Sequence, residues 1–323
     1  MPLIVNNLTL KYLYGVTAIQ DISFTLNSNE KLAVLALESG GKTTLFKSLA
    51  GLLKPATGNI SINNINIYDS KLKDLDIVAI SSDLWIKKHQ TVKRSLEAPL
   101  RIRGIKKKDR LEQIVLASSK FGIYPNLTDL VSQLDKEDLI RTVFARSSLR
   151  TSNLFLIDNV FAILNTPRRT QLFREMTPYI KSITAPFVFM TDSPDEAFSI
   201  CEKVLILNFG VKQQYASPLE ILTRPETLFV DKFIFPYKTT TEVEINNLKL
   251  YYRCSFVESK SSTNKFKVKD VFYRNNSPHA LLTNNIEIPI MEFPIHDEYS
   301  IEENLASSNY FTVNDEKRYD LTL

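Results

Sequence analysis

Glycine and cysteine are scarce in this chain. Eight of its 323 residues are glycine and two are cysteine. The cysteines, Cys201 and Cys254, form no metal-binding or disulfide spacing, so nothing points to a disulfide-stapled fold and a reduced, cytosolic chain is favoured. Two of the eight glycines stand side by side at positions 40 and 41. In a chain with so little glycine, this pair indicates a tight backbone at that point.

Long apolar runs and a strong charge of one sign are also missing. No run approaches the roughly 18 residues that span a bilayer, and the N-terminus lacks the basic stretch and apolar core of a signal peptide. Any membrane role is therefore expected to come through a partner. The net charge is only +4, from 40 basic and 36 acidic residues. Composition thus gives no reason to expect a nucleic-acid partner.

The periodicity of the sequence changes near residue 236 and predicts two domains. Residues 1–235 alternate strand-like and helix-like segments, which indicates an α/β fold with a mainly parallel sheet covered by helices. Residues 85–150 within this part are expected to form a helical subdomain. Residues 236–323 show short strand patterns between polar turns, so we predict a small all-β domain there. Strands of the first domain are expected at residues 8–10, 19–26, 31–37, 59–68, 77–80, 154–157, 187–190 and 204–208.

The most informative motif lies between the expected strand 31–37 and an expected helix at 43–53. It reads Gly40-Gly41-Lys42-Thr43-Thr44. A phosphate-binding loop needs backbone N–H groups at a helix start, a Lys for the β- and γ-phosphates and a hydroxyl for Mg²⁺. Lys42 and Thr43 supply the last two. The pattern is incomplete, because Ala36 stands where the first glycine of the loop belongs.

With this motif and its flanks, the chain resembles the ATPase subunits of ATP-binding-cassette (ABC) transporters. It is most similar to the importer branch that serves maltose, other sugars, glycerol phosphate and polyamines. The segments that carry the resemblance are 45–58, 113–145, 215–225, 229–234 and 311–317. The resemblance is strong through residue 235 and weaker beyond it. It implies a P-loop ATPase core, a helical subdomain and a C-terminal regulatory barrel of the OB or MOP type.

The resemblance also implies a site and partners. ATP and Mg²⁺ are the implied cofactors, and the loop residues Ser39, Gly40, Gly41, Lys42, Thr43 and Thr44 would hold the phosphates. Thr43 and Asp158 would hold the metal, and Tyr14 would stack on adenine, with Tyr12 as the alternative. Membrane-spanning permease subunits would place the chain on the cytoplasmic face of the membrane. A second ABC ATPase subunit would face this one, with each ATP between one chain's loop and the other chain's signature motif.

The catalytic positions of the family are replaced in this chain. Asn159 stands where the family has the glutamate that acts as general base, a loss worth about 10²–10⁴-fold. Asp192 stands where a histidine contacts the γ-phosphate, and Ser82 where a longer glutamine senses the metal and water. In the loop itself, Ser39 replaces a glycine at a position expected to need positive φ, and Glu38 adds a negative charge near the phosphates.

The signature motif is altered most. The family presents a serine and a glycine-exposed helix start to the opposite nucleotide, whereas this chain has Asp135-Lys136-Glu137-Asp138. Ser132-Gln133-Leu134 before it and Ala145-Arg146 after it fix the alignment on both sides. Losses in both halves of the site therefore fall on one chain, so neither composite site of a dimer would be standard.

These replacements lead to one main hypothesis and two alternatives. The main hypothesis is a non-hydrolysing pseudo-ATPase, a nucleotide-binding subunit with a structural or regulatory role in a heteromeric importer. We expect a heterodimer rather than a homodimer, because a homodimer would carry every defect twice. The first alternative is a slow but genuine ATPase completed by its partner. The second is a P-loop regulatory binding protein without a transporter.

Overall fold

A computed structural model describes residues 2–12, 15–69, 75–81, 86–236, 239–245, 248–258, 265–274, 277–282, 287–289, 298–312 and 317–318. The chain divides into two compact units, Met1–Lys212 and Gln213–Leu323. The second unit begins earlier than the boundary predicted at 235/236, because residues 226–231 bond to the C-terminal strands. The boundary at 235/236 stays a prediction about the domains.

The first unit is built on a ten-stranded sheet in the order β5-β4-β1-β2-β10-β9-β3-β8-β7-β6, of which strand β10 runs across the boundary at residues 212 and 213. Strands β3, β6, β7, β8 and β9 pair in parallel, and β1, β2, β4 and β5 pair antiparallel. The strands are β1 (Leu3–Lys11), β2 (Thr17–Leu26), β3 (Lys31–Leu35), β4 (Thr57–Ile62), β5 (Ile65–Asn66), β6 (Ile77–Ser81), β7 (Leu154–Asp158), β8 (Phe187–Thr191), β9 (Lys203–Asn208) and β10 (Val211–Ala216). The α/β class predicted from periodicity is confirmed.

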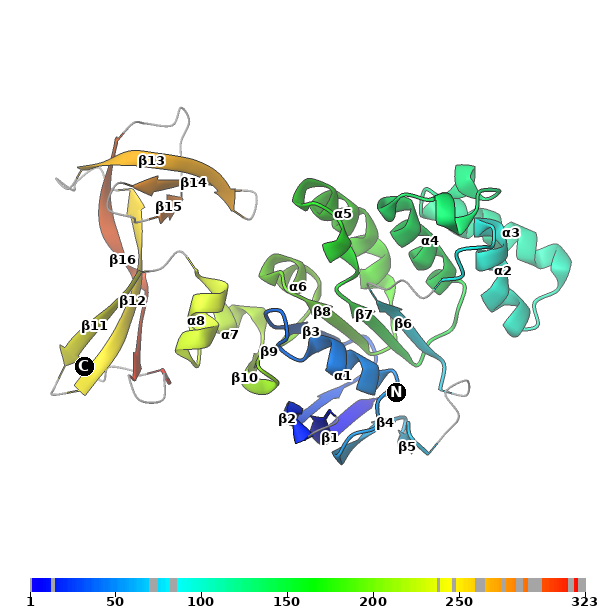
Figure 1. The fold of residues 1–323 in the computed structure, drawn as a ribbon, viewed down its shortest axis with the longest axis horizontal. Coiled ribbons are helices and arrows are strands. Elements are labelled where there is room, and N and C mark those ends of the chain that lie inside the picture. The colour runs from blue at the N-terminus through cyan, green and yellow to red at the C-terminus, as the bar shows by residue number, and fades with distance from the viewer. Residues whose placement is uncertain are drawn as a thin grey trace. The chain divides into compact units, whose positions relative to one another are not determined.

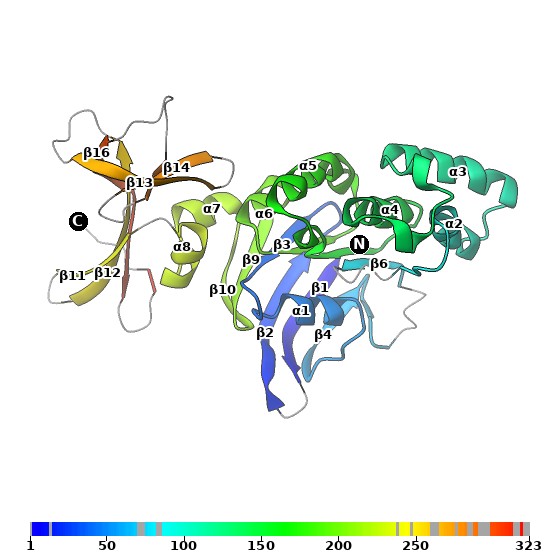
Figure 2. The same ribbon diagram turned by 45° about the horizontal axis from the view of Figure 1, so that its top comes forward.

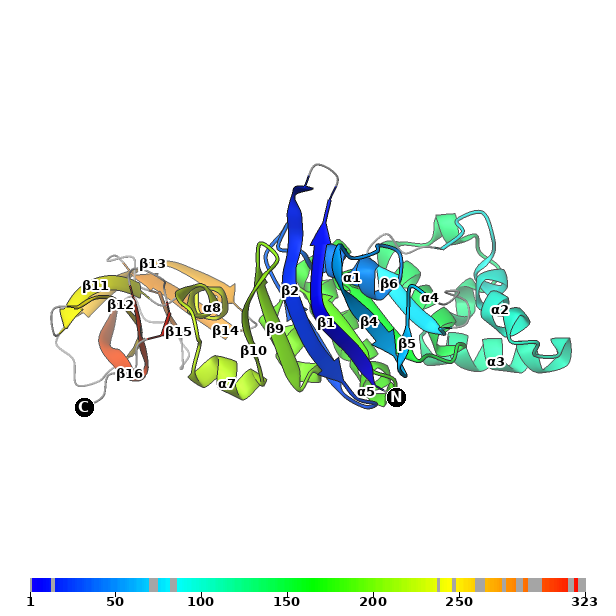
Figure 3. The same ribbon diagram turned by 90° about the horizontal axis from the view of Figure 1, so that it is seen from below.

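Helices cover both faces of the parallel strands. Helix α1 packs on β7 and β8 and also contacts β2, so it lies between the parallel and antiparallel parts of the sheet, while α4 and α5 lie on the other side (Figure 1, Figure 3). The helices are α1 (Lys42–Leu49), α2 (Val92–Ile102), α3 (Lys107–Lys120), α4 (Lys136–Ser148), α5 (Thr166–Ser182) and α6 (Pro194–Ile200), with short 3₁₀ turns η3 (Tyr124–Asn126), η4 (Val131–Gln133) and η5 (Val160–Ile163).

The core under α4 and α5 is aromatic. Phe144 stacks on Phe161 with ring centroids 5.7 Å apart, and Phe155 stacks on Phe187 at 5.8 Å. All five residues of β7 and of β8 are buried, as expected of strands covered on both faces. This packing fixes the carboxyl ends of β7 and β8, where the candidate site residue Asp158 ends β7 and Asn159 and Asp192 follow the two strands.

Local differences from the sequence prediction have simple causes. The segment 59–68 is not one strand but the hairpin β4–β5, because Asn63 and Asn64 adopt positive φ angles of 54° and 63° and reverse the chain. Helix α1 ends at Leu49 rather than at residue 53, and Gly51 follows with a φ of 73°. Both differences lie outside the loop that precedes α1.

The second unit contains helices α7 (Pro218–Thr223) and α8 (Leu228–Ile234) and a six-stranded antiparallel sheet (Figure 2). Its order is β11-β12-β16-β13-β14-β15, from β11 (Thr239–Ile245), β12 (Leu248–Glu258), β13 (Lys265–Arg274), β14 (Ser277–Leu282), β15 (Glu287–Pro289) and β16 (Glu298–Thr312). Buried Asp231 of α8 accepts hydrogen bonds from Arg253 at 2.7 Å and Asn309 at 3.0 Å. The elements described from β11 to β16 are all strands, and the separate all-β domain and its closure into a barrel stay predictions.

Candidate functional site

The loop between β3 and α1 folds as a tight turn. The N–H of Gly40 donates to the carbonyl of Leu37 at 3.1 Å, and Ser39 adopts a φ of 60°. The positive φ expected at Ser39 is therefore present, on a residue that favours it far less than glycine does. Gly41 has a φ of 101°, and a Cβ there would lie 2.7 Å from Ile19 Cδ1. The φ of Gly41 thus favours glycine at this position, and a Cβ would also lie 3.0 Å from the carbonyl oxygen of Ala18.

The start of α1 is open. Gly41 is its N-cap, no side chain caps it, and its first turn contains no acidic residue. The first N–H groups of a helix have no partner within the helix, and they carry the positive end of its dipole. A loop followed by such a start is a ready site for phosphate. The structure therefore gives the predicted phosphate loop the backbone arrangement that it needs.

Lys42 is held inside this loop. Its side chain is buried, and its Nζ donates hydrogen bonds to the carbonyl oxygens of Leu37, at 2.9 Å, and Ala36. Burial lowers the pKa of Lys42 below its ordinary value, while the charges of Asp192, Asp158 and Glu38 oppose this shift. Three carboxylates thus act on the ammonium group that is placed to meet phosphate.

A cavity of about 510 Å³ opens over the loop. It is lined by every predicted phosphate-binding residue from Ser39 to Thr44, and also by Glu38 and Asn159. Tyr12, the alternative for adenine stacking, lines it too, and its hydroxyl hydrogen-bonds to that of Thr44. Tyr14 and Ser82, both predicted site residues, lie outside the described residues.

The neighbouring strands bring the other predicted residues to the same edge of the sheet. Leu35 of β3 pairs with Thr191 of β8, and β8 pairs in turn with β7, which ends at the buried Asp158. The N–H of Asn159 donates to the carbonyl of Met190 at 2.8 Å. The Asn159 side chain carries an amide in place of a carboxylate, so it cannot accept the proton of an attacking water molecule.

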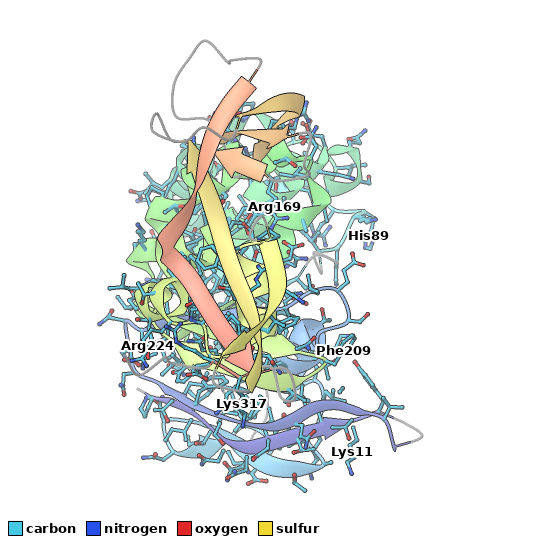
Figure 4. All side chains as sticks on the ribbon, turned by 90° about the vertical axis from the view of Figure 1, so that its left-hand side faces the viewer. Lys11, His89, Arg169, Phe209, Arg224 and Lys317 are labelled. Atoms are coloured by element: carbon cyan, nitrogen blue, oxygen red, sulfur yellow. The ribbon has the colours of Figure 1, made fainter. Side chains whose placement is uncertain are left out.

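Asp192 has a partner that the sequence reading missed. Arg169 of α5, which Figure 4 labels, binds the Asp192 carboxylate at 2.7 Å and the buried Glu196 carboxylate at 2.6 Å. Burial would lower the pKa of Arg169, but Glu196 and Asp192 raise it above its ordinary value. The position that the family uses for a γ-phosphate contact is therefore an anion engaged in an internal ion pair. An Arg-Arg pair at 168 and 169 was the only sequence signal for it.

The altered signature segment forms the start of α4, and this start is closed. Asp135 is the N-cap, and its carboxylate accepts the N–H of Asp138 at 2.8 Å. Glu137 and Asp138 fill the first turn with acidic side chains. Glu137 also pairs with Arg141 at 2.7 Å, and Arg141 pairs with Glu175 of α5 at 2.6 Å. The segment thus caps helix α4, and the Asp138 N–H is used within the chain and not presented to an external anion.

Comparison with known proteins agrees with this geometry. The family model described as ABC transporter matches residues 19–162, which contain the phosphate loop, Asp158 and the α4 segment. This part of the chain is an ABC transporter ATPase domain. The resemblance to ABC transporter ATPase subunits, predicted from the phosphate loop and its flanks, is confirmed. A solved ABC-domain structure, CbiO1 from Clostridium perfringens, part of the CbiONQ transporter complex, superimposes with a TM-score of 0.60. It covers 72% of this chain and 92% of its own, and at 19% identity it supports the ABC fold alone.

Curated relatives of the ABC domain are importer proteins. The chain is 28% identical over 229 residues to the sn-glycerol-3-phosphate import ATP-binding protein UgpC of Bartonella quintana (strain Toulouse). It is also 28% identical over 233 residues to the trehalose import ATP-binding protein SugC of Mycobacterium tuberculosis (strain CDC 1551 / Oshkosh). These alignments cover 71% and 72% of this chain but only 66% and 59% of the relatives. Both relatives agree with the predicted sugar-importer-like branch.

Proposed function

We propose that this chain is the nucleotide-binding subunit of an ABC importer of the carbohydrate-like branch and that it does not hydrolyse ATP at an ordinary rate. Its role would be structural or regulatory. The names of its relatives support the importer branch, and the open start of α1 supports nucleotide binding. Permease subunits and a second, different ABC ATPase subunit would be its partners. No helix in the described ranges is long and apolar enough to cross a bilayer, so attachment at the cytoplasmic face would depend on the permease.

The observation that carries the non-hydrolysing part is the closed start of α4. In the arrangement implied by the family, this helix start would meet the γ-phosphate of the opposite subunit's nucleotide. Here the Asp135 carboxylate already accepts the Asp138 N–H, and Glu137 adds a further negative charge in the first turn. Negative charge at this place repels phosphate. The chain therefore contributes a poor second half to its partner's site, while Asn159 leaves its own half without a base.

The residues around the phosphate loop fit Mg²⁺ and the phosphates of a nucleotide. Thr43 is exposed in the cavity lining, and Asp158, at the end of β7, acts electrostatically on Lys42. Mg²⁺ is commonly held by one or two protein oxygens together with substrate phosphates and water, so no cage of several carboxylates is needed. When bound, the ion would neutralise phosphate charge. The negative charges of Glu38 and Asp192 would oppose this neutralisation of the phosphates, so we expect the chain to bind ATP more weakly.

The test is hydrolysis of Mg-ATP by the purified chain, alone and with its partner subunits, with Lys42→Ala as background. We expect phosphate release by the chain alone to equal that background. Turnover at a rate ordinary for the family would overturn the proposal. Asn159→Glu separates the alternatives: a gain of about 10²–10⁴-fold would show that only the base was missing. That result would favour a slow, genuine ATPase.

Retention of Lys42 and Thr43 also leaves open a P-loop regulatory protein that works without a transporter. Affinity purification from cells distinguishes the two. Recovery of membrane-spanning permease subunits with the wild-type chain supports the importer subunit. Recovery of the chain from the cytosol without any permease would support the regulatory protein instead.

A further inference from the structure

The turn between helices α2 and α3 carries a dense group of positive charges. Residues 101–108 contain five basic side chains and no acidic one. Over the whole chain the two signs nearly balance, at 40 basic and 36 acidic residues. All five basic side chains of the turn are exposed: Arg101, Arg103, Lys106, Lys107 and Lys108. These five residues, with Ile102 between the two arginines, are called the basic turn below.

A helix-ending motif holds the backbone of the basic turn. The N–H of Gly104 donates to the carbonyl of Arg101 at 3.1 Å, and the N–H of Ile105 donates to the carbonyl of Leu100 at 3.0 Å. Gly104 has a φ of 73°. Two such hydrogen bonds around a left-handed glycine form a Schellman motif at the end of α2. A Cβ on Gly104 would meet nothing within 4 Å, and α2 and α3 lie at the outer end of the first unit (Figure 3). The turn is therefore open to its surroundings.

The charges of the basic turn contribute little to the fold. Arg103 donates to the carbonyl of Leu149 at 3.1 Å, but none of the five basic side chains forms an ion pair with any acid that the structure describes. Glu97 of α2 is already paired with Arg110, at 3.0 Å. The three lysines stand at the start of α3, where the helix dipole disfavours cations, and no side chain caps that start. Charges that break a local folding rule indicate a role outside the chain.

An apolar side chain stands among these charges. Ile102 is 88% exposed, and no other large apolar side chain that the structure describes is more exposed. The buried face of α2 is formed by other residues, Leu96 and Leu100 among them, so Ile102 is not part of the core. Cations that surround an exposed apolar residue are typical of segments that lie in a membrane interface. There the cations meet anionic head groups and the apolar side chain enters the acyl boundary.

We propose that the basic turn is a lipid-contact site that binds the anionic head groups of a membrane surface while Ile102 enters the acyl boundary. Charge complementarity selects this occupant, because a bilayer with anionic lipids presents a broad negative surface to an exposed turn with five cations and no acid. The contact goes beyond the proposed function, since it joins the chain to lipid directly and adds to attachment through the permease. It is reversible, because a basic patch with one apolar side chain does not anchor a protein stably.

The test is co-sedimentation of the full chain with vesicles of phosphatidylglycerol and phosphatidylcholine in equal parts, compared with vesicles of phosphatidylcholine alone. We expect binding to the anionic vesicles only, and weaker binding at higher salt, because salt screens exposed charges. The triple variant Lys106→Gln, Lys107→Gln, Lys108→Gln should bind about 100-fold more weakly, about fivefold for each cation removed.

A matched control removes the same net charge from exposed lysines outside the turn. It is the triple variant Lys54→Gln, Lys181→Gln, Lys212→Gln. This control should bind the anionic vesicles nearly as wild type does. Equal losses in the two triple variants would overturn the assignment of the basic turn, because they would show that only the net charge of the chain matters.

A second variant tests the apolar part of the contact. Ile102→Ala should weaken binding by about 5- to 50-fold, because three carbon atoms no longer enter the acyl boundary. The salt dependence of its binding should stay that of wild type, since no charge is removed. Leu219→Ala is the matched control, because Leu219 is an apolar residue of α7 that is 71% exposed. An unchanged affinity of Ile102→Ala would overturn the role of Ile102.

Folding of the triple lysine variant is checked by urea denaturation. Its unfolding free energy should be no lower than that of wild type, because lysines are unfavourable at a helix start. Equal binding of wild type to neutral and anionic vesicles would overturn the lipid contact, and so would an unchanged affinity of the triple variant. Binding only to vesicles that carry the permease would overturn it as well and would assign the basic turn to an acidic protein surface. None of these results affects nucleotide binding, which calorimetry with Mg-ADP measures separately.

Discussion

Helices α1 and α4 each begin at a segment for which the family resemblance implies phosphate binding, yet their N-termini differ in capping and in charge. The start of α1 has a glycine N-cap, no capping side chain and no acidic residue in its first turn. The start of α4 has a capping carboxylate from Asp135 and two further acids in its first turn. Both helices have the same backbone dipole. What differs is whether the N–H donors are left for a ligand or used within the chain.

This difference shows that the N–H donors of one helix start can be used within the chain while those of another helix start stay available. An Asp cap stabilises its own helix by about 1 kcal/mol. The same cap makes the helix start a poor anion site for two reasons. The Asp135 carboxylate accepts the Asp138 N–H, and its negative charge repels an anion. Under the proposed function, the chain would keep the phosphate loop of its own half of the site, without the base, and would contribute a poor second half to its partner's site.

The largest expected effect breaks the comparison on the α1 side. Lys42→Ala removes the cation of the phosphate loop and should weaken binding of both ADP and pyrophosphate by about 10- to 150-fold, the value of a charged hydrogen bond. Lys47→Ala, an exposed lysine of the same helix, is the control and should change neither. Calorimetry gives the affinities, and a thermal melt shows whether the loop remains folded. An unchanged affinity for pyrophosphate would mean that phosphate binds elsewhere.

A second change opens the α4 start. Asp135→Ala removes the cap and should cost about 1 kcal/mol of unfolding free energy, measured by urea denaturation. Asp135→Ser keeps a capping oxygen and loses the charge, so it should cost much less. If the two variants are equally destabilised, the cap hydrogen bond to the Asp138 N–H is not what holds this start. The Asp135 charge itself would then be the stabilising element.

The sequence predicted more of this comparison on the α1 side than on the α4 side. The strand-loop-helix order and the tight glycine pair follow from local residue types, the positive φ of Ser39 follows from the family resemblance, and the structure has all three. The roles of Asp135 and Arg169 depend on contacts formed after folding. The sequence indicates only that Asp135 replaces a serine of the family, and the structure shows that it caps helix α4. Arg169 bridges α5 to the segment after β8, a pairing across 23 residues of sequence that periodicity cannot reveal. The Asn63–Asn64 turn was missed because a strand pattern continued on both sides of it.

A third change alters the charge that faces α1. Asp192→Asn removes one of the carboxylates acting on Lys42 and should tighten ATP binding relative to ADP about fivefold, since ATP carries the additional phosphate charge. The ratio of the two dissociation constants isolates this effect from the loss of the Arg169 ion pair, which is partly exposed and therefore weak. Asp195→Asn, an exposed carboxylate of α6, is the matched control. A ratio that stays constant would show that Asp192 does not face the terminal phosphate.

The smallest effect concerns the crowding of acids at the α4 start. Burial, and then the charge of Asp135, raise the pKa of Asp138 above its ordinary value of 3.8, and Arg141 only partly opposes them. The folded protein then holds this proton more strongly than the unfolded chain does. The stability that this protonated carboxyl contributes is present below pH 3.8 and is lost as the pH rises through the folded-state pKa.

Asp138→Asn cannot ionise, so at pH 7 this variant should be more stable than wild type by less than about 1 kcal/mol, a difference that fades toward low pH. Asp109→Asn in the first turn of α3 reports the ordinary loss of a charge at a helix start, and urea denaturation of both variants at pH 7 and pH 4 gives the comparison. If Asp138→Asn loses as much stability at pH 7 as Asp109→Asn, the acids at the α4 start do not oppose one another, and the closed start is electrostatically favourable throughout.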